Sequence, residues 1–282
     1  MFDFDITRGY PACVMKTKNI AKRSKVEIIE RLEDFTKVPR KIVAVAMDYT
    51  ESMLVPFHSH DISQLEYASS GVLKVRTRTG IWFVPPYSAV WVPAHMEHET
   101  SSSGGRLSLR TLFIRHDDST GLPKDCCVVS VPPLLRELIL HAVTLPREYD
   151  FGSADERIMN VIFDLIQTLQ PTPFNLPISQ DNRLQKIYHM LAENPADNRT
   201  LEQWGKSVGA TGRTLSRLFR SQTGMSFGQW RQQFRILSAM ERLEAGESVT
   251  NIALDLGYES TSAFITMFRK VLGKTPGQYF KV

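Results

Sequence analysis

The chain has 282 residues, of which 42% are hydrophobic, 10% aromatic and 23% charged. This length suits about two domains, and the composition is that of a globular protein, which excludes disordered and collagen-like chains. No window reaches the roughly 18 uninterrupted apolar residues of a membrane span, and the opening residues carry acids where a secretory signal has bases. We therefore expect a cytoplasmic protein without membrane contact.

The first half of the chain has the pattern of an antiparallel β-barrel or sandwich. Short runs of β-forming residues recur about every ten residues, separated by glycine and proline. The predicted strands cover residues 42–46, 64–68, 72–76, 81–84, 90–92, 107–114 and 128–131. We therefore predict a barrel over residues 1–131, with an N-terminal arm.

Two amphipathic helices are predicted over residues 132–170. The first begins at Pro132 and Pro133, and the second follows a capping box formed by Ser153 and Glu156. The apolar stripe of the second helix contains Ile158, Val161, Ile162, Leu165, Ile166 and Leu169. Such helices either pack on their own barrel or form a dimer interface. We favour a homodimer, because the segment is strongly apolar and a symmetric partner would pair the flanking domains.

Three prolines mark a connector between the two parts of the chain. Pro171, Pro173 and Pro177 fall within seven residues, a density that excludes a continuous helix or a central strand. We predict a linker over residues 171–180 and a second domain over residues 181–282. The chain from residue 180 onward holds 14 Lys and Arg against 9 Asp and Glu, a balance that favours an anionic partner.

Histidines in the first part have a spacing that suits a binding site. His58 and His60 lie two residues apart at a strand edge, so both imidazoles point to the same face. Gln64 and Gly71 follow, and His98 comes after another hairpin. This order resembles the two sequence motifs of cupins, and the resemblance implies that His58, His60, Gln64 and His98 line the barrel interior. Gln64 replaces the usual carboxylate, and an amide is a poorer ligand for a hard divalent ion.

Three roles stay open for these polar side chains: metal ligands, hydrogen-bonding groups for an organic effector, and structural groups. We favour an organic effector, because a few polar groups among aromatic side chains are typical of small-molecule sites. Tyr67, Trp82 and Trp91 are candidate aromatic walls, and each is equally compatible with core packing. This interpretation requires no cofactor, and a divalent metal in the barrel stays open.

The C-terminal part contains two copies of one unit. Residues 204–210 align with residues 252–258, and residues 215–227 align with residues 264–276 after one inserted residue. In each copy a helix ends at a glycine, an N-cap follows at Thr211 or Ser260, and a second helix begins. This pattern predicts a pair of helix-turn-helix motifs.

The second helix of each copy is expected to enter a DNA major groove, which admits one helix. In the first copy, Arg213 and Arg217 lie one turn apart and can form bidentate contacts with guanine. The corresponding positions of the second copy carry hydroxyl and apolar side chains instead of arginine, so this copy is expected to read bases weakly. The predicted base-reading residues are Arg213, Thr214, Ser216, Arg217, Thr261, Ser262, Ile265 and Thr266.

Other basic side chains are expected to hold the DNA backbone. The predicted phosphate-binding residues are Arg220, Arg231, Arg235, Arg269 and Lys270. Residues 226–245 can form one helix of about 20 residues and about 30 Å. This length is close to the roughly 34 Å between successive major-groove segments, so both motifs are expected to bind one face of a duplex.

Four segments carry a family resemblance: TLSRLF at 214–219, IA and LGY within 252–258, SAF and FR within 262–269, and GKTP with Tyr279 near the end. On these residues, the segment 200–280 resembles the DNA-binding domain of AraC/XylS transcription regulators. The resemblance implies a bacterial regulator whose first domain is an effector-binding barrel. Thr266 stands where many members of the family have arginine.

We therefore predict an α+β multidomain protein, with a cupin-like antiparallel barrel and helices followed by an all-α DNA-binding domain. It is expected to be a sequence-specific transcription regulator without catalytic residues, controlled by a small-molecule effector. The expected partners are double-stranded DNA, the effector, a second copy of the chain and RNA polymerase. Two alternatives stay open: a metal-responsive regulator that uses the barrel histidines, and a cupin enzyme fused to a DNA-binding module.

Overall fold

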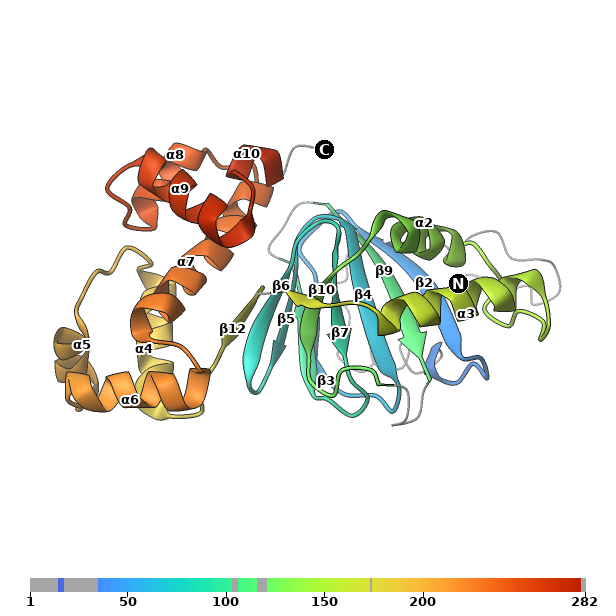
Figure 1. Cartoon of the computed structure of the whole chain (residues 1–282), viewed down its shortest axis with the longest axis horizontal. Helices are drawn as coiled ribbons and strands as arrows, with labels where there is room; N and C mark the ends of the chain where they lie inside the picture. Colours follow the sequence, from blue (N-terminus) through green and yellow to red (C-terminus); the bar gives the residue numbers. More distant parts are fainter. Residues whose placement is uncertain (1–14, 18–34, 103–105, 116–120, 173, 280–282) are drawn as a thin grey trace. The chain divides into compact units, whose positions relative to one another are not determined.

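The computed structural model describes residues 15–17, 35–102, 106–115, 121–172 and 174–279 (Figure 1). The chain divides into two compact units. The first comprises Met1–Leu73 and Val84–Pro173, and the second comprises Lys74–Phe83 and Phe174–Val282. The predicted N-terminal arm lies outside the described residues, apart from strand β1 (Met15–Thr17).

A seven-stranded sheet forms the centre of the first unit. Its order is β1, β2 (Ile42–Tyr49), β9 (Leu107–Ile114), β4 (Ser63–Ser70), β7 (Ser88–Val92), β10 (Cys127–Ser130) and β11 (Pro171–Thr172). Neighbouring strands are antiparallel, except that β1 and β2 run parallel. Leu65 of β4 lies opposite Leu112 of β9 and Trp91 of β7, so the central strands share an apolar row. The predicted antiparallel, sheet-rich first part is confirmed.

Two shorter strands of the first unit carry histidines. β3 (Leu54–His58) and β8 (His98–Ser101) pair antiparallel, and His58 lies opposite His98. The pairing is irregular between Val55 and His58. The sequence pattern predicted neither strand, because both are short and mix polar with apolar residues.

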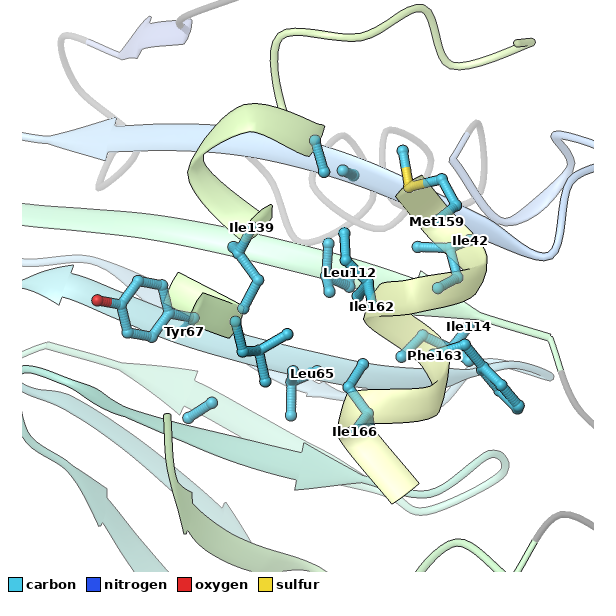
Figure 2. Close-up of a cluster of buried hydrophobic side chains, with 14 of the residues drawn as sticks. Ile42, Leu65, Tyr67, Leu112, Ile114, Ile139, Met159, Ile162, Phe163 and Ile166 are labelled. Carbon is cyan, nitrogen blue, oxygen red and sulfur yellow. The ribbon is translucent and has the colours of Figure 1, made fainter. Parts of the chain in front are cut away.

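Two helices cover one face of the large sheet (Figures 1 and 2). They are α2 (Pro133–Ala142) and α3 (Ala154–Gln167), close to the predicted positions. Their buried residues share one apolar cluster with the sheet: Ile42, Leu65, Leu112, Leu135, Ile139, Met159, Ile162, Phe163 and Ile166 are among its members. Most apolar side chains of both helices are therefore buried against their own sheet. Val161 of α3 is an exception and is exposed.

The second unit consists mainly of helices, as predicted. They are α4 (Asn182–Glu193), α5 (Leu201–Val208), α6 (Gly212–Thr223), α7 (Phe227–Glu244), α8 (Val249–Asp255), α9 (Thr261–Leu272) and α10 (Pro276–Tyr279). α4, α5 and α6 pack together beside one part of α7, and α8 and α9 pack beside another part of it (Figure 1). Among the described residues, no helix is long and apolar enough to cross a membrane.

Strands β5 (Leu73–Thr77) and β6 (Gly80–Val84) contribute most of their residues to the second unit. The sequence pattern assigned this hairpin to the barrel. In the second unit β6 pairs with β12 (Asn175–Pro177), which packs against α7, and Lys74 forms an ion pair with Glu241 of α7. Such contacts join residues that lie far apart in the sequence, such as Lys74 and Glu241, so a linear pattern cannot reveal them.

The chain passes from the first unit to the second at residues 173–174, inside the predicted linker at residues 171–180, and a short strand lies on each side of this point. Pro171 and Thr172 form β11 at the edge of the large sheet, and residues 175–177 form β12 beside β6. Proline is excluded from a central strand but is tolerated at a sheet edge, where its missing N–H breaks no ladder bond.

Candidate DNA-binding surface and ligand site

The first helix-turn-helix is built from α5 and α6. α5 ends at Gly209, whose φ of 69° is in the left-handed region, and the N–H of Ala210 then donates to the carbonyl of Gly205. The Thr211 hydroxyl accepts a hydrogen bond from the N–H of Thr214 at 3.1 Å and so caps α6. The predicted glycine and N-cap are therefore confirmed.

The second helix-turn-helix repeats this arrangement with α8 and α9. Gly257 adopts a φ of 75° after α8, and the Ser260 hydroxyl accepts from the N–H of Ala263 at 3.1 Å. Phe264 and Phe268 are buried on one side of α9. The two copies are thus alike in conformation as well as in sequence.

Helix α7 joins the two motifs. It contains 18 residues, which corresponds to about 27 Å. Ser226 caps it through a capping box with Gln229, and Trp230, Phe234 and Met240 are buried along its length. The predicted single connecting helix is therefore confirmed, and it serves as the core of the unit as well as a spacer.

Helix α6 presents a basic face opposite its buried side. Leu215 and Phe219 are buried, whereas Arg213 and Arg217 are exposed. Thr214 and Ser216 are half-buried beside them, and the exposed Arg220 continues the basic face toward the end of the helix. The structure thus brings the predicted base-reading residues of the first copy onto one helix with their charged groups in solvent.

Helix α9 presents a less basic face. Ser262 and Thr266 are exposed, Thr261 and Ile265 are half-buried, and no arginine occurs among them. Its basic residues, Arg269 and Lys270, are exposed in the last turn of the helix. This placement suits phosphate contact at the end of α9 more than base contact.

Two of the predicted phosphate-binding arginines make structural contacts. Arg235 is buried, and its guanidinium donates to the carbonyl of Pro195 at 2.9 Å and to Asn198 Oδ1 at 3.0 Å. Arg231 is half-buried and donates to the carbonyl of Arg199 at 3.1 Å. Burial of Arg235 favours a structural role, and its predicted phosphate contact stays a prediction. α7 is a central helix, and these positions face the loop before α5 rather than solvent.

The three predicted histidines meet in the first unit. One ligand atom from each of His58, His60 and His98 lies within 4.8 Å of the others. The ring centroids of His58 and His98 are 4.3 Å apart, and those of His60 and His98 are 5.2 Å apart. His98 is fully buried, and the other two are half-buried.

A chain of polar side chains extends from this cluster into the sheet. His60 Nε2 lies 2.7 Å from Gln64 Oε1, and Gln64 Nε2 donates to Glu66 Oε1 at 2.9 Å. Thr100 donates to the other Glu66 oxygen at 3.3 Å. Sequence reasoning missed Glu66, although its position two residues after Gln64 on the same strand face was a usable signal.

Burial changes the pKa values of two members of this polar chain. The pKa of Glu66 is raised to about 7, because desolvation outweighs the opposing effect of the Thr100 hydrogen bond. Desolvation, with a smaller contribution from the nearby His58, lowers the pKa of His98 to about 3. His98 is therefore a neutral imidazole at pH 7, with a lone pair available for a ligand.

Two of the predicted aromatic walls, Tyr67 and Trp91, lie on the face of the large sheet opposite to Gln64. Tyr67 and Trp91 belong to the apolar cluster between the large sheet and helices α2 and α3, where Figure 2 shows Tyr67. Strand residues alternate between faces, so Tyr67 points opposite to Gln64 and Glu66. Trp82 belongs to β6 in the second unit. All three side chains are buried in packing roles.

These features define a two-part protein, with a sheet-rich domain that holds a polar cluster and a helical domain with paired helix-turn-helix motifs. Two family models match: an AraC-like ligand-binding domain over residues 42–187, and a helix-turn-helix domain over residues 204–281. The chain belongs to the AraC family of transcriptional regulators. Its first part is a ligand-binding domain, and its second part is a DNA-binding domain.

Relatives agree with this assignment. The chain is 36% identical to the HTH-type transcriptional regulator NimR of Escherichia coli over 230 residues, which is 82% of this chain and 84% of NimR. It is 33% identical to the HTH-type transcriptional regulator RipA of Corynebacterium glutamicum over 39% of this chain and 32% of RipA. ToxT of Vibrio cholerae aligns over 85% of this chain and 98% of its own, with 14% identity and a TM-score of 0.37.

Proposed function

We propose that this regulator reads its operator mainly through α6, and that α9 serves mainly to hold the duplex. The observation that carries the proposal is the exposure of Arg213 and Arg217 on the face of α6 opposite Leu215 and Phe219. Arginine at the exposed first half of a recognition helix can donate two hydrogen bonds to guanine O6 and N7. The corresponding positions of α9 carry hydroxyl and apolar groups, which discriminate bases less strongly.

The proposal includes control by a ligand in the first domain. A ligand that binds two conformations of the protein unequally shifts the balance between them, and DNA affinity changes with that balance. We propose a small-molecule effector for this role. A metal ion is a second candidate, because three imidazoles converge in the same domain.

A homodimer and contact with RNA polymerase complete the proposed assembly. Val161 of α3 is 46% exposed although the other large apolar side chains of that helix are buried or half-buried, and this leaves apolar surface for a second copy. A dimer would present two copies of α6 and α9 to one operator. Its DNA partner implies that the regulator works in the bacterial cytoplasm.

Footprinting on duplexes from the gene's own upstream region, at low salt, tests DNA recognition. Arg217→Ala is expected to cost about 1 to 3 kcal/mol at the protected site and to relax preference at one base position. Arg220→Ala is the matched control on the same helix. It should weaken binding to all DNA sequences alike, and it should reduce the slope of log affinity against log salt concentration by about one, which corresponds to one phosphate contact. An Arg217→Ala protein with unchanged base preference would remove α6 as the base reader.

A further inference from the structure

We propose that His58, His60 and His98 form a binding site for a divalent transition-metal ion, with Gln64 as a fourth ligand. This inference deepens the proposed function and rests on it, since it gives the ligand-binding domain a ligand of definite chemistry. The three histidines come from β3, the turn after it and β8, so distant segments of the domain supply the site.

The tautomers of the three imidazoles prepare them for a metal. Each Nδ1 lies against a backbone carbonyl: that of Pro56 for His58 at 2.8 Å, Ile62 for His60 at 2.6 Å, and Met96 for His98 at 2.9 Å. A carbonyl oxygen can only accept, so each Nδ1 carries the proton and donates. In the neutral ring Nε2 then carries the lone pair. Metal-binding histidines use this arrangement, in which the second nitrogen donates to a backbone carbonyl and fixes the ring.

The buried Nε2 atom of His98 indicates that the site binds a ligand. Its Nε2 is buried, and the part of the chain that the structure describes provides no hydrogen-bond partner for that atom. A buried acceptor without a partner costs about 1 to 3 kcal/mol, so such atoms usually have a role. The nitrogen lies in the cluster with the two other imidazoles, where a cation would satisfy it.

The contact between His60 and Gln64 points to the same conclusion. Gln64 Nε2 donates to Glu66, which fixes the amide with its oxygen toward His60. His60 Nε2 and Gln64 Oε1 then face each other at 2.7 Å, although both are acceptors in the neutral groups. A cation bound to both atoms would turn this repulsion into attraction. A proton on His60 would also satisfy the pair, and the experiment below separates the two cases.

Glu66 has a positioning role in this site. Its carboxylate accepts from the Gln64 amide and from Thr100, so it stands behind the proposed ligand rather than in contact with the ion. A negative charge behind the amide group increases the electron density on the amide oxygen and strengthens it as a ligand. This arrangement compensates for the amide that replaces a carboxylate at Gln64.

The distances and donor types select the class of ion. Two ligands about 2.1 Å from one ion are at most about 4.2 Å apart, so atoms within 4.8 Å need only small side-chain rotations. Imidazole nitrogens suit Zn²⁺, Ni²⁺, Co²⁺ and Fe²⁺, whereas Mg²⁺ and Ca²⁺ prefer carboxylate and water oxygens. We therefore expect binding of first-row transition ions and no competition from Mg²⁺.

Cobalt titration of the chelator-stripped, full-length protein tests the inference. CoCl2 should produce visible d–d absorption that saturates at one ion per chain, and ZnCl2 should displace it. ZnCl2 should also raise the melting temperature, because an ion that binds only the folded state stabilises it. A tenfold excess of MgCl2 should leave the cobalt spectrum unchanged. Absence of cobalt absorption and of any zinc-induced shift would overturn the proposal and leave a proton as the partner of His60.

Variants locate the ion. His60→Ala and His98→Ala should each abolish the cobalt spectrum, whereas His141→Ala, an exposed histidine on α2, should leave it intact. Gln64→Glu should retain or tighten binding, which keeps the test decisive if removal of a histidine disturbs folding. Glu66→Gln should weaken cobalt binding by about 10- to 100-fold without changing the ligands. Unaltered binding in both histidine variants would refute the site.

DNA binding is measured separately, so the two failures are distinguishable. A metal-free protein that still protects its operator, with no cobalt bound under any condition, refutes the metal site and leaves the regulator function intact. A protein that binds cobalt at these histidines and protects no DNA refutes the proposed function and leaves the metal site intact.

Discussion

Arg235 Nε donates a hydrogen bond of 2.9 Å to the carbonyl oxygen of Pro195, and so ties helix α7 to the loop before α5. The same guanidinium donates to Asn198 Oδ1 at 3.0 Å and to the carbonyl of Asp197 at 3.3 Å. The side chain is buried. Its charge therefore serves the fold of the DNA-binding domain, although the sequence places it within a basic segment.

Arg235→Ala should lower the free energy of unfolding by about 2 to 4 kcal/mol, because it leaves buried carbonyl oxygens without donors. Urea denaturation measures this change. Arg220→Ala, an exposed arginine on α6, should change stability by less than about 0.5 kcal/mol. If Arg235→Ala instead retained full stability and reduced the salt dependence of DNA binding, Arg235 would be a phosphate contact after all.

Two glycines with the same backbone conformation should respond differently to alanine. Gly209 and Gly257 both have positive φ, but only Gly257 approaches another segment. A Cβ on Gly257 would lie 2.8 Å from the carbonyl oxygen of Ala196 and 2.9 Å from its Cα. Gly209→Ala should cost about 1 to 2 kcal/mol from backbone strain alone. Gly257→Ala should cost about 1 to 3 kcal/mol more in thermal or urea unfolding. Equal losses would show that the loop moves away freely.

The pH dependence of stability should contain two opposing contributions. The pKa of Glu66 rises from 4.5 to about 7 on folding, so the folded state binds the extra proton between these values. Its contribution to stability therefore decreases as pH rises through that window. The pKa of His98 falls from 6.5 to about 3, so its contribution increases as pH rises from 3 to 6.5. Each slope is about 1.4 kcal/mol per pH unit, and the two cancel where the windows overlap.

Glu66→Gln should therefore expose the histidine contribution. Between pH 4.5 and 6.5, the free energy of unfolding of this variant should rise with pH about 1.4 kcal/mol per unit more steeply than that of the natural protein. Urea unfolding in the presence of a chelator measures both proteins. His98→Gln should change the slope by a similar amount in the opposite direction. Parallel pH profiles for all three proteins would contradict the burial argument.

Substitutions at two adjacent residues of α3 test folding and self-association independently. Ile162 is fully buried against the sheet, and Ile162→Ala should cost about 2 to 5 kcal/mol of stability. Val161 is 46% exposed, and Val161→Asp should leave monomer stability nearly unchanged while it lowers the mass measured by sedimentation equilibrium. A Val161→Asp protein that stays fully dimeric would place the dimer contact elsewhere.

Local patterns predicted the elements and their caps well. Thr211 and Ser260 cap the two recognition helices, and the connecting helix runs over the predicted segment. These features depend on neighbours within a few positions in the sequence, where helix and turn preferences act directly. The histidine spacing was likewise informative, since His58, His60 and His98 do meet.

Tertiary packing decided the points where sequence reasoning failed. Tyr67 and Trp91 were assigned to a pocket by residue type, and strand alternation places them under the helices instead. Arg235 was assigned to phosphate by local charge, and its burial in α7 favours a structural role. Glu66 was missed although the sequence places it on the same strand face as Gln64, whereas its hydrogen bond with Thr100 of another strand depends on tertiary packing.

The Trp230 indole N–H donates to the carbonyl of Pro177 at 2.9 Å, and this bond limits how the DNA-binding domain can be exchanged. A chimeric regulator that keeps only the residues after 177 would contain the Trp230 indole but lack the Pro177 carbonyl that accepts its hydrogen bond. The indole N–H, in the first turn of α7, would then need a new acceptor from the sensor that is joined to it. Fusion points upstream of residue 174 keep β12 and the Pro177 carbonyl with α7, but β6, the partner strand of β12, stays with the sensor.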